Sequence, residues 1–384
     1  MSLARKITTV IALMLTPLFI QTNLWFNVTP IQELLQIDPT ISYQKCFDDT
    51  HFNHVPFPLS INPAGHPHEG FFKETFILTI AQGRVQGEYG FVISNQHFIK
   101  ELMWKEIECH LNLVQKIPDD QVIKISGRVA VITQLAYFNY WHWLSEVLCR
   151  LALLELAGVE YDYLYVPQES SFMKETLALW GIPAEKIVSP THGGFCIQAD
   201  ELIVPSLVSN VNFGCVLFSC YAQPHLIQYV KEKLLSAALK TDTALQLQSK
   251  VFVSRKDATQ RLILNEQRVF ALFQAEGFHS FQLEKMSVAE QILLFHNADI
   301  IVSPQGTGLA NSIFCTEKTR IVELFQGLND ATFWYLSQTL GFEYTPIKTT
   351  SFATEYVTAW KSNTYMPLYI IKNVIEGLKK ADDK

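Results

Sequence analysis

The sequence of 384 residues has few charged side chains and none of the paired cysteines of a redox or zinc motif. Lys, Arg, Asp and Glu make up only 17% of the chain, and acidic residues outnumber basic ones, for a net charge of −7. A nucleic-acid-binding protein should present a basic face, so this balance argues against a nucleic-acid partner. Seven cysteines are scattered without any CxxC pair, which favours a reducing compartment over a disulfide framework.

The chain also lacks a complete G-x-G-x-x-G fingerprint, a low-complexity tract and an internal repeat. Its nearest approach is Gly306 and Gly308, followed by Asn311 where the third glycine belongs. This departure speaks against a Rossmann dehydrogenase or epimerase. The content of hydrophobic residues, 48%, is that of a globular protein, and the length suffices for two domains with separate cores.

The N-terminus carries an apolar run behind two basic residues, Arg5 and Lys6. The run is shorter than the roughly 20 residues of a spanning helix, and no small-residue cleavage site is obvious. Residues 7–26 therefore favour a membrane anchor or interfacial helix, with a signal peptide or a buried helix as alternatives. We expect a cytoplasmic, membrane-associated protein; a location in the secretory lumen is the alternative.

Strand and helix patterns organise the rest of the chain. Residues 31–70 are polar and rich in proline and predict irregular structure, and their histidines fit no standard zinc spacing, so we predict no metal site. Residues 71–99 contain short segments of alternating polar and apolar residues, separated by glycines, which predicts antiparallel strands. In residues 127–206 and 250–325 strands alternate with helices at short intervals, which implies parallel sheets.

These patterns predict an α/β fold with two Rossmann-like domains that face each other across a cleft, the first with added antiparallel strands. We divide the chain into an apolar segment, residues 1–30, an N-terminal domain, residues 31–220, and a C-terminal domain, residues 221–384. The last helix, about Pro367 to Lys379, is expected to pack back on the N-terminal domain.

The stretch from Asp299 to Phe314 predicts an anion site. Residues 300–302 are β-branched, as in a buried strand. Pro304 has no N–H to donate and should end the hydrogen bonding of this strand. Gly306 and Gly308 then permit φ values that other residues resist, and they let a ligand approach the backbone. The unpaired N–H groups of the following helix would face this turn, where phosphate binds well. A turn that merely connects a strand to a helix is the structural alternative.

Two adjacent cations, Arg255 and Lys256, directly follow the strand pattern KVFV, and Arg261 and Asn265 precede a helix. In an acidic protein, adjacent cations at the carboxyl end of a strand could neutralise a diphosphate without a metal. Glu323 ends the strand pattern RIVEL and could accept hydrogen bonds from ribose hydroxyls. The alternative for the cations is a solvated turn.

The helix that Asn139 should cap carries His142, Glu146 and Arg150 at intervals of four residues. His142 would lie in the first turn, where the helix dipole favours the neutral imidazole, a candidate base that Glu146 could orient. Residues 137–143 hold five aromatic side chains, a composition typical of sugar and nucleotide pockets. A polar ladder on a solvated helix face is the structural alternative.

Three motifs occur in order: NYWHWLSEVLCRL, then VSRKDATQR, then EQILLFHNADIIVSPQGTGLANSIF with VELF behind it. Together they resemble glycosyltransferase family 61, whose usual strings are close to N-Y-F-H-W-x-x-E-x-L-P-R, S-R and H-G-A-G-L-x-N. The match extends over about residues 127–325. The family is related in motif to the glycosyltransferases of capsular polysaccharide biosynthesis.

The resemblance implies a GT-B fold and an inverting glycosyltransferase, either a hexosyl- or a pentosyltransferase. Such an enzyme moves a sugar from a nucleoside diphosphate, with a UDP-sugar as the favoured donor, to a hydroxyl of a glycan or glycolipid acceptor. The resemblance implies neither a further cofactor nor a metal-binding DxD motif, and the chain contains no DxD. The N-terminal domain would then lie on the acceptor side, and the C-terminal domain would bind the nucleotide sugar.

Position by position, the first motif carries over to Asn139, His142 and Glu146, and the second to Arg255. We expect His142 or Glu146 to be the catalytic base, without a choice between them. The expected donor-binding residues are Arg255, Lys256, Gln305, Gly306, Thr307, Gly308, Leu309, Asn311 and Glu323. The residues expected to support the motifs are Asn139, Arg150, Arg261 and Asn265.

Two positions depart from the family pattern: Gln305 replaces the usual histidine, and Cys149 stands where proline is frequent. Gln305 can donate a hydrogen bond to a phosphate but carries no charge. A nucleotide-sugar-binding protein that has lost catalysis is therefore the alternative function.

Overall fold

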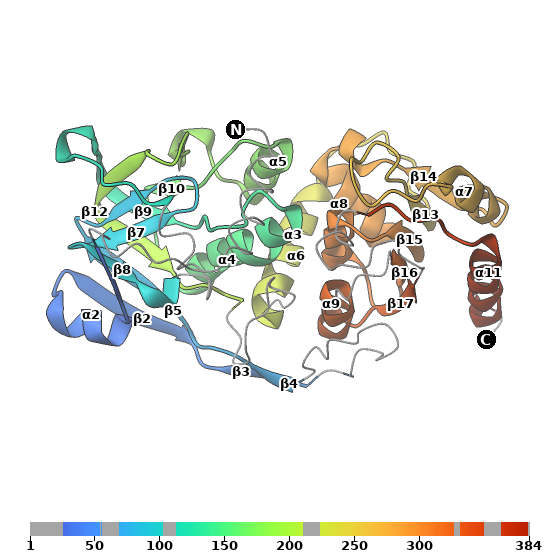
Figure 1. Cartoon of the computed structure of the whole chain (residues 1–384), viewed down its shortest axis with the longest axis horizontal. Helices are drawn as coiled ribbons and strands as arrows, with labels where there is room; N and C mark the ends of the chain where they lie inside the picture. The colour runs from blue at the N-terminus through green and yellow to red at the C-terminus, as the bar shows by residue number, and fades with distance from the viewer. Residues whose placement is uncertain are drawn as a thin grey trace. The chain divides into compact units, whose positions relative to one another are not determined.

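The computed structural model describes residues 26–53, 55, 69–102, 113–209, 223–325, 331–348 and 362–382. The chain divides into two units (Figure 1). The N-terminal unit comprises residues 1–52 and 70–230, and the C-terminal unit comprises residues 53–69 and 231–384. No helix in the described ranges is long and apolar enough to span a membrane, and the predicted anchor lies outside them except for Phe26.

The N-terminal unit is built on a mixed sheet of ten strands, in the order β1-β8-β7-β6-β12-β9-β10-β11, with β5 paired to β12 and β2 paired to β5. Strands β12, β9, β10 and β11 are parallel to one another, whereas β5, β6, β7 and β8 make antiparallel pairs. The predicted antiparallel strands before the parallel part are therefore present. The strands are β1 (Asn27–Thr29), β2 (Ile41–Phe47), β5 (Thr75–Ala81), β6 (Arg84–Gln86), β7 (Phe91–Ser94), β8 (His97–Ile99), β9 (Ile123–Val131), β10 (Tyr163–Tyr165), β11 (Ile187–Val188) and β12 (Cys196–Pro205).

The prediction of irregular structure after residue 30 is wrong for the first half of that stretch. Helix α2 (Ile31–Ile37) buries Ile31 and Leu34 against the sheet, and β2 pairs with β5. Strands β3 (Thr50–Asn53) and β4 (Glu69–Phe72) form a separate pair. The polar composition gave no sign of these elements, because they are stabilised by contacts with strands that are distant in the sequence.

Short helices connect the parallel strands of the N-terminal unit. Helix α5 (Ser171–Trp180) ends at Gly181, which adopts the left-handed conformation with φ of 90°. The other helical elements before the C-terminal unit are η1 (Lys100–Leu102), η3 (Asp119–Gln121), α3 (Tyr140–His142), the π-helical η4 (Trp143–Val147), α4 (Leu148–Leu156), η5 (Ala184–Lys186) and α6 (Pro224–Ala238), which crosses the boundary in sequence between the units.

The C-terminal unit contains a five-stranded sheet in the order β14-β13-β15-β16-β17, and every pair is parallel. The strands are β13 (Lys250–Val253), β14 (His279–Phe281), β15 (Ile300–Pro304), β16 (Arg320–Phe325) and β17 (Glu343–Lys348). Counted along the chain, this order is 2-1-3-4-5, so the direction of winding reverses between β13 and β15. The predicted parallel α/β pattern is confirmed.

Helices α7 (Glu266–Gln274), α8 (Val288–Asn297), α9 (Thr332–Leu340) and α11 (Leu368–Asp382) belong to this unit, together with the 3-10 helices η6 (Leu283–Lys285) and η7 (Thr307–Phe314). Ser287 and Glu290 form a capping box that starts α8. That the last helix packs back on the N-terminal domain stays a prediction. Helix α11 contributes Ile371 and Ile375 to the core that Phe273 of α7 shares.

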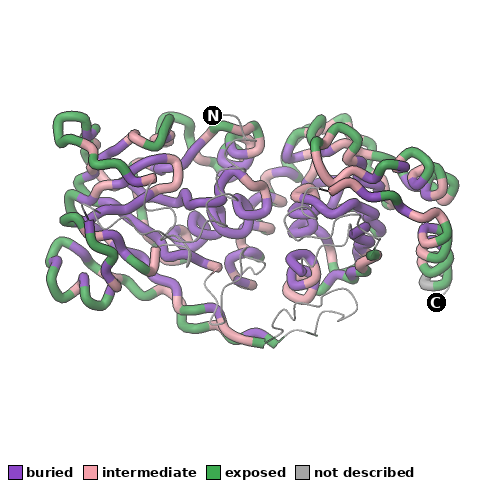
Figure 2. The backbone as a smooth tube through the Cα atoms, in the orientation of Figure 1, coloured by how far each residue is buried: buried purple, intermediate pink, exposed green. Residues whose placement is uncertain are grey.

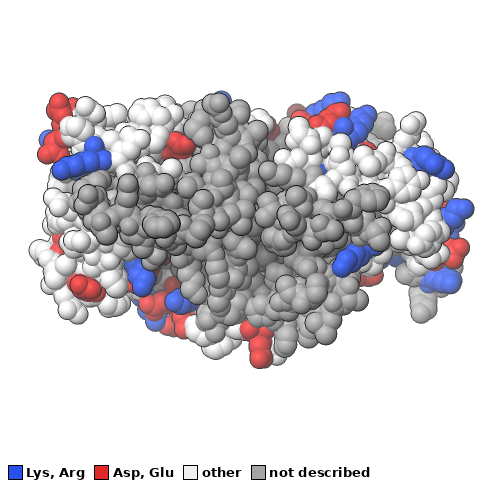
Figure 3. Space-filling model, in the orientation of Figure 1, with Lys and Arg blue, Asp and Glu red and all other residues white. Residues whose placement is uncertain are grey.

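Burial follows this plan, because the central strands of both units are buried while α2 and α11 expose one side (Figure 2). On the face that Figure 3 presents, the acidic and basic side chains of the described residues are interspersed and do not form a single basic field. This mixture agrees with the weakly acidic composition.

Asn265 joins two distant segments of the C-terminal unit. Its Nδ2 donates to the carbonyl of Met366 at 2.8 Å, and its Oδ1 accepts from the Met366 N–H at 2.9 Å. The side chain is 8% exposed, so an Asn265→Ala variant would leave two backbone groups without partners. We expect it to lower the free energy of unfolding by about 1–3 kcal/mol, measured by thermal or urea denaturation of the full chain.

The control is Leu264→Ala at the neighbouring position, which is 61% exposed. Surface truncation of this kind should change the stability by no more than about 0.5 kcal/mol. If Asn265→Ala were as stable as this control, the bond to Met366 would not stabilise the unit.

Candidate functional site

The carboxyl ends of β13 and β15 meet where the C-terminal sheet reverses its winding. Arg255 follows β13 closely, and Gln305 and Gly306 directly follow β15. In open α/β sheets the ligand binds in the crevice at this topological switch point. The fold thus brings together the arginine of the second sequence motif and the glycine turn of the third.

Arg255 lies directly against the backbone of Gly306. A Cβ atom added at Gly306 would come within 2.0 Å of Arg255 Nη1 and 2.8 Å of its Cζ, so no larger residue fits while the arginine keeps this position. A Cβ at Gly308 would come within 2.9 Å of Leu283 Cδ1. Gly306 thus allows the Arg255 side chain to approach the backbone closely, whereas at Gly308 only the end of the flexible Leu283 side chain would have to move.

The expectation that these glycines supply unusual φ values is wrong. Gly306 has φ of 167°, extended backbone that any residue adopts, and Gly308 has no positive φ. The helix that follows is also tighter than expected, because η7 is a 3-10 helix and not an α-helix. Its first N–H groups still point toward the turn, as at any helix start.

Residues of the glycine turn divide into accessible and buried ones. Thr307 and Gly308 are half-buried, whereas Leu309 is fully buried and packs into the core. Asn311 is also buried, and its Nδ2 donates to Gln291 Oε1 at 2.9 Å and to the Gly308 carbonyl at 3.1 Å. Leu309 and Asn311 thus hold the turn in place, while Thr307 and Gly308 form its accessible edge.

Gln305 continues the sheet, because its N–H donates to the Leu324 carbonyl at 3.1 Å. The side chain is 2% exposed, and its Oε1 has no hydrogen-bond partner among the residues that the structure describes. An amide oxygen in this state is costly in free energy, and a ligand with an O–H or N–H group would satisfy it.

Glu266, the first residue of α7, fixes the loop that carries Arg255. Its carboxylate accepts from the Ser254 hydroxyl and, at 3.1 Å, from the Arg255 backbone N–H. The Arg255 guanidinium donates through Nη2 to the Gln260 carbonyl at 3.3 Å. Burial and the nearby charge of Arg261 together lower the pKa of Arg255 to about 10, and the carboxylates of Glu284 and Glu266 act in the opposite direction. Two guanidinium groups that repel each other favour a bound anion.

Two predicted donor residues, Lys256 and Glu323, and the motif-supporting Asn265 have other surroundings than Arg255. Lys256 is exposed on the loop, and Asn265 binds the backbone of Met366. Glu323 was expected at a strand end, but β16 continues to Phe325, and β16 lies on the side of β15 away from β13. The Glu323 carboxylate is 1% exposed and accepts a hydrogen bond from the Tyr344 hydroxyl.

The second candidate region is the motif helix of the N-terminal unit. Asn139 caps it as predicted, and its side chain accepts from the Trp141 N–H at 2.9 Å. His142, Glu146 and Arg150 are 4%, 2% and 3% exposed, so the alternative of a solvated polar ladder is wrong. All residues from 141 to 154 are buried, which places these three polar groups inside the unit.

A π-helical turn, η4, lies between His142 and Arg150, and short π segments frequently occur at functional sites. Here the Leu148 N–H reaches back to the Trp143 carbonyl, and Cys149 Sγ lies 3.5 Å from the Leu144 carbonyl oxygen. No residue pattern in the motif signalled this widening.

His142 Nδ1 and Glu146 Oε1 lie 3.4 Å apart, longer than a strong hydrogen bond. Gln134 Nε2 donates to the other oxygen of Glu146. Gln134 therefore orients the carboxylate, and sequence reasoning missed it because it precedes the motif and follows β9.

Arg150 connects the ends of β9 and β12. Its Nη1 donates to the Thr133 carbonyl at 2.6 Å, and Nε and Nη2 donate to the Pro205 carbonyl at 3.1 and 2.6 Å. Burial lowers the pKa of Arg150 to about 9, and the negative charge of Glu146 acts in the opposite direction. Arg150 is thus a clamp between strands as well as a member of the motif.

A metal site of three or more His, Cys, Asp or Glu side chains does not occur within the described part of the chain. Of the histidines in the proline-rich stretch, His54, His66 and His68 lie outside the described residues.

The sequence model of the family described as Glycosyltransferase 61 matches residues 140–322. This range begins in the motif helix of the N-terminal unit and ends in β16, so it contains both candidate regions. No curated protein matches the chain. The resemblance noted from the three motifs is confirmed over residues 140–322, which match the model of glycosyltransferase family 61.

Proposed function

We propose that the protein is an inverting glycosyltransferase of the GT-B type that moves a sugar from a nucleoside diphosphate, with UDP favoured, to a hydroxyl of a glycan or glycolipid. The observation that carries this proposal is the Arg255 guanidinium packed against Gly306 at the switch point of a parallel sheet. This combination of charge, a backbone without a side chain and a position at the strand ends suits a diphosphate.

The C-terminal unit would hold the donor without a metal ion. Arg255 would bind the diphosphate oxygens in a bidentate manner, and the N–H groups at the start of η7 would face the same oxygens. The repulsion between Arg255 and Arg261 would be relieved by the bound anion. These groups would stabilise the charge that develops on the nucleoside diphosphate as it leaves.

The N-terminal unit would act on the acceptor. In an inverting displacement the acceptor oxygen forms a bond to the anomeric carbon while the bond to the diphosphate breaks, and a base removes the hydroxyl proton. His142 and Glu146 are the candidates, since they are neighbours in a buried site and Gln134 orients the carboxylate. A cytoplasmic location, attachment to a membrane through residues 7–26 and a role in polysaccharide biosynthesis complete the proposal; the secretory lumen is the alternative location.

A protein that binds nucleotide sugars without catalysis is the second candidate. It is favoured by Gln305, an uncharged residue at the position of the usual family histidine, whose Oε1 lacks a partner among the described residues. Donor binding without any transfer or hydrolysis would support this alternative.

The role of Arg255 can be tested by thermal shift of the full chain with UDP and other nucleoside diphosphates, with and without EDTA. We expect one nucleotide to stabilise the protein and the effect to survive EDTA. Arg255→Ala should weaken the affinity about 10- to 100-fold, because charge-assisted hydrogen bonds are lost. Arg268→Ala removes the same charge from an exposed position of α7 and should bind normally. Equal affinities of the two variants would refute the assignment.

Gly306→Ala tests the close approach itself. The added methyl group would displace the end of the flexible Arg255 side chain, so the protein should fold but bind the nucleotide about tenfold or more weakly. Gly377→Ala is the matched control, since a Cβ there meets no atom within 4 Å. Because Gly377 lies in helix α11, the Gly377→Ala variant should have a free energy of unfolding about 0.5–1 kcal/mol higher and an unchanged affinity for the nucleotide. Normal nucleotide affinity in Gly306→Ala would contradict the proposed site.

The choice of base can be tested with His142→Ala and Glu146→Gln, assayed for transfer and for hydrolysis of the nucleotide sugar. Loss of the true base should lower turnover about 100-fold or more, with donor affinity by calorimetry unchanged. The variant that retains turnover identifies the residue that is not the base. Full activity in both would exclude the pair from the chemistry.

A further inference from the structure

The N-terminal sheet also has a switch point, and a cavity lies there. The parallel strands β12-β9-β10-β11 run in the chain order 4-1-2-3, so the winding reverses between β9 and β12. Thr133 and Gln134 follow β9, and Val204 and Leu207 stand at the end of β12; all four line the cavity. Ligands bind at this position in open α/β sheets.

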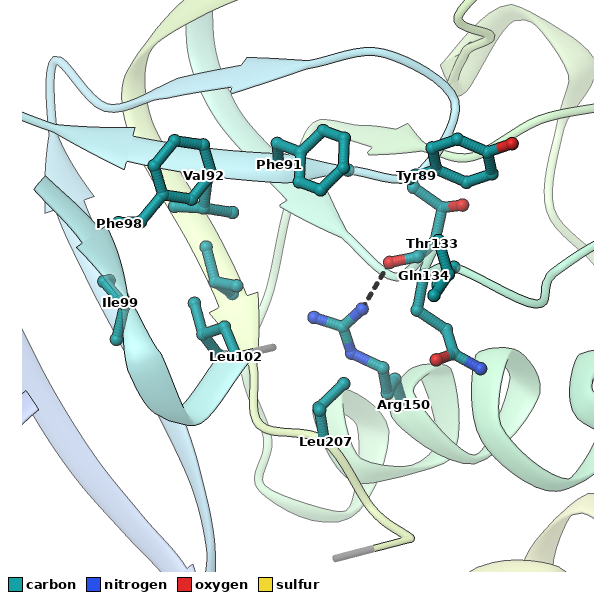
Figure 4. Close-up of a pocket in the computed structure, with 13 residues that line it drawn as sticks. Tyr89, Phe91, Val92, Phe98, Ile99, Leu102, Thr133, Gln134, Arg150 and Leu207 are labelled. Atoms are coloured by element: carbon teal, nitrogen blue, oxygen red, sulfur yellow. Dashed lines mark hydrogen bonds between the residues drawn. The ribbon is translucent and has the colours of Figure 1, made fainter. Parts of the chain in front are cut away.

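Arg150 supplies hydrogen-bond donors to the cavity. Its three hydrogen bonds to the Thr133 and Pro205 carbonyls use three of the five guanidinium N–H groups. One N–H on each Nη atom remains without a partner among the described residues. The guanidinium extends from α4 toward the side chains that line the cavity (Figure 4).

Gln134 supplies an acceptor beside these donors. Because a carboxylate only accepts, the bond to Glu146 must come from Nε2, which fixes the orientation of the amide. Gln134 Oε1 is buried and has no partner in the described part of the chain. Figure 4 shows this oxygen on the side that faces Arg150.

The remaining walls are apolar and include Phe91 and Phe98 from β7 and β8. The centres of water-sized groups can occupy about 30 Å³ of the cavity, which is room for a small polar group of a few atoms. A carboxylate would satisfy Arg150 but would repel Gln134 Oε1. A hydroxyl group would leave the apolar walls without a partner. An acetamido group offers a carbonyl acceptor, an N–H donor and a methyl group together.

We infer that this cavity binds the acetamido group of an N-acetylhexosamine in the acceptor glycan. The carbonyl oxygen accepts from Arg150, the N–H donates to Gln134 Oε1, and the methyl group contacts Phe91 and Phe98. The inference rests on the proposed function, which assigns the acceptor to the N-terminal unit.

The test measures binding of methyl N-acetylglucosaminide and methyl glucoside to the full chain by saturation-transfer NMR and titration. We expect the acetamido sugar to bind about 10- to 100-fold more tightly, with the strongest saturation on its methyl protons. Leu207→Phe should fill the cavity and abolish the preference. Leu156→Phe, at a position of the same unit that is 42% exposed, should keep it.

Equal affinity of the wild-type protein for the two glycosides would overturn the inference, and so would a preference that survives Leu207→Phe. A thermal shift with UDP, run in parallel, tests the proposed function separately, because the donor residues lie in the other unit. A preference that appears only between UDP-N-acetylglucosamine and UDP-glucose would assign the acetamido group to the donor and overturn the acceptor assignment.

Discussion

Both candidate sites depend on one constraint: the burial of a guanidinium group at the switch point of the parallel strands in each sheet. Arg150 bridges the Thr133 and Pro205 carbonyls, and Arg255 lies on the Gly306 backbone. Removing an arginine from water is unfavourable, as the lowered pKa of both groups indicates. Backbone carbonyls compensate this cost only where strand ends converge, so the sheet order determines where each charge can lie.

The two arginines differ in the charge that surrounds them. Arg150 has Glu146 one turn earlier on its own helix, so the negative charge of this carboxylate compensates the positive charge of the guanidinium. Arg255 has the guanidinium of Arg261 as a neighbour, together with the carboxylates of Glu284 and Glu266. The second guanidinium beside Arg255 is the difference on which we base the proposed phosphate site, whereas we assign neutral polar groups to the site at Arg150.

The motif helix adds a second constraint, because its polar residues are buried on all sides. A π-helical turn changes the spacing between His142 and Arg150, and Gln134 from the end of β9 holds one oxygen of Glu146. Each polar group thus depends on a partner from another element. A substitution at any one of them leaves a buried charge or amide without its partner, which costs more than a surface change would.

By itself the sequence determined the α/β pattern, the cap at Asn139 and the family motifs, because periodicity, capping and motif spacing are local properties. It also placed Arg255 and Gly306 after strands. Only the tertiary structure decided that β13 and β15 are neighbours. It also decided that Arg255 occupies the space that a side chain at Gly306 would need. It also paired Glu323 with the Tyr344 hydroxyl and buried His142, Glu146 and Arg150. Strand order and burial arise from contacts between distant segments, and no local pattern encodes them.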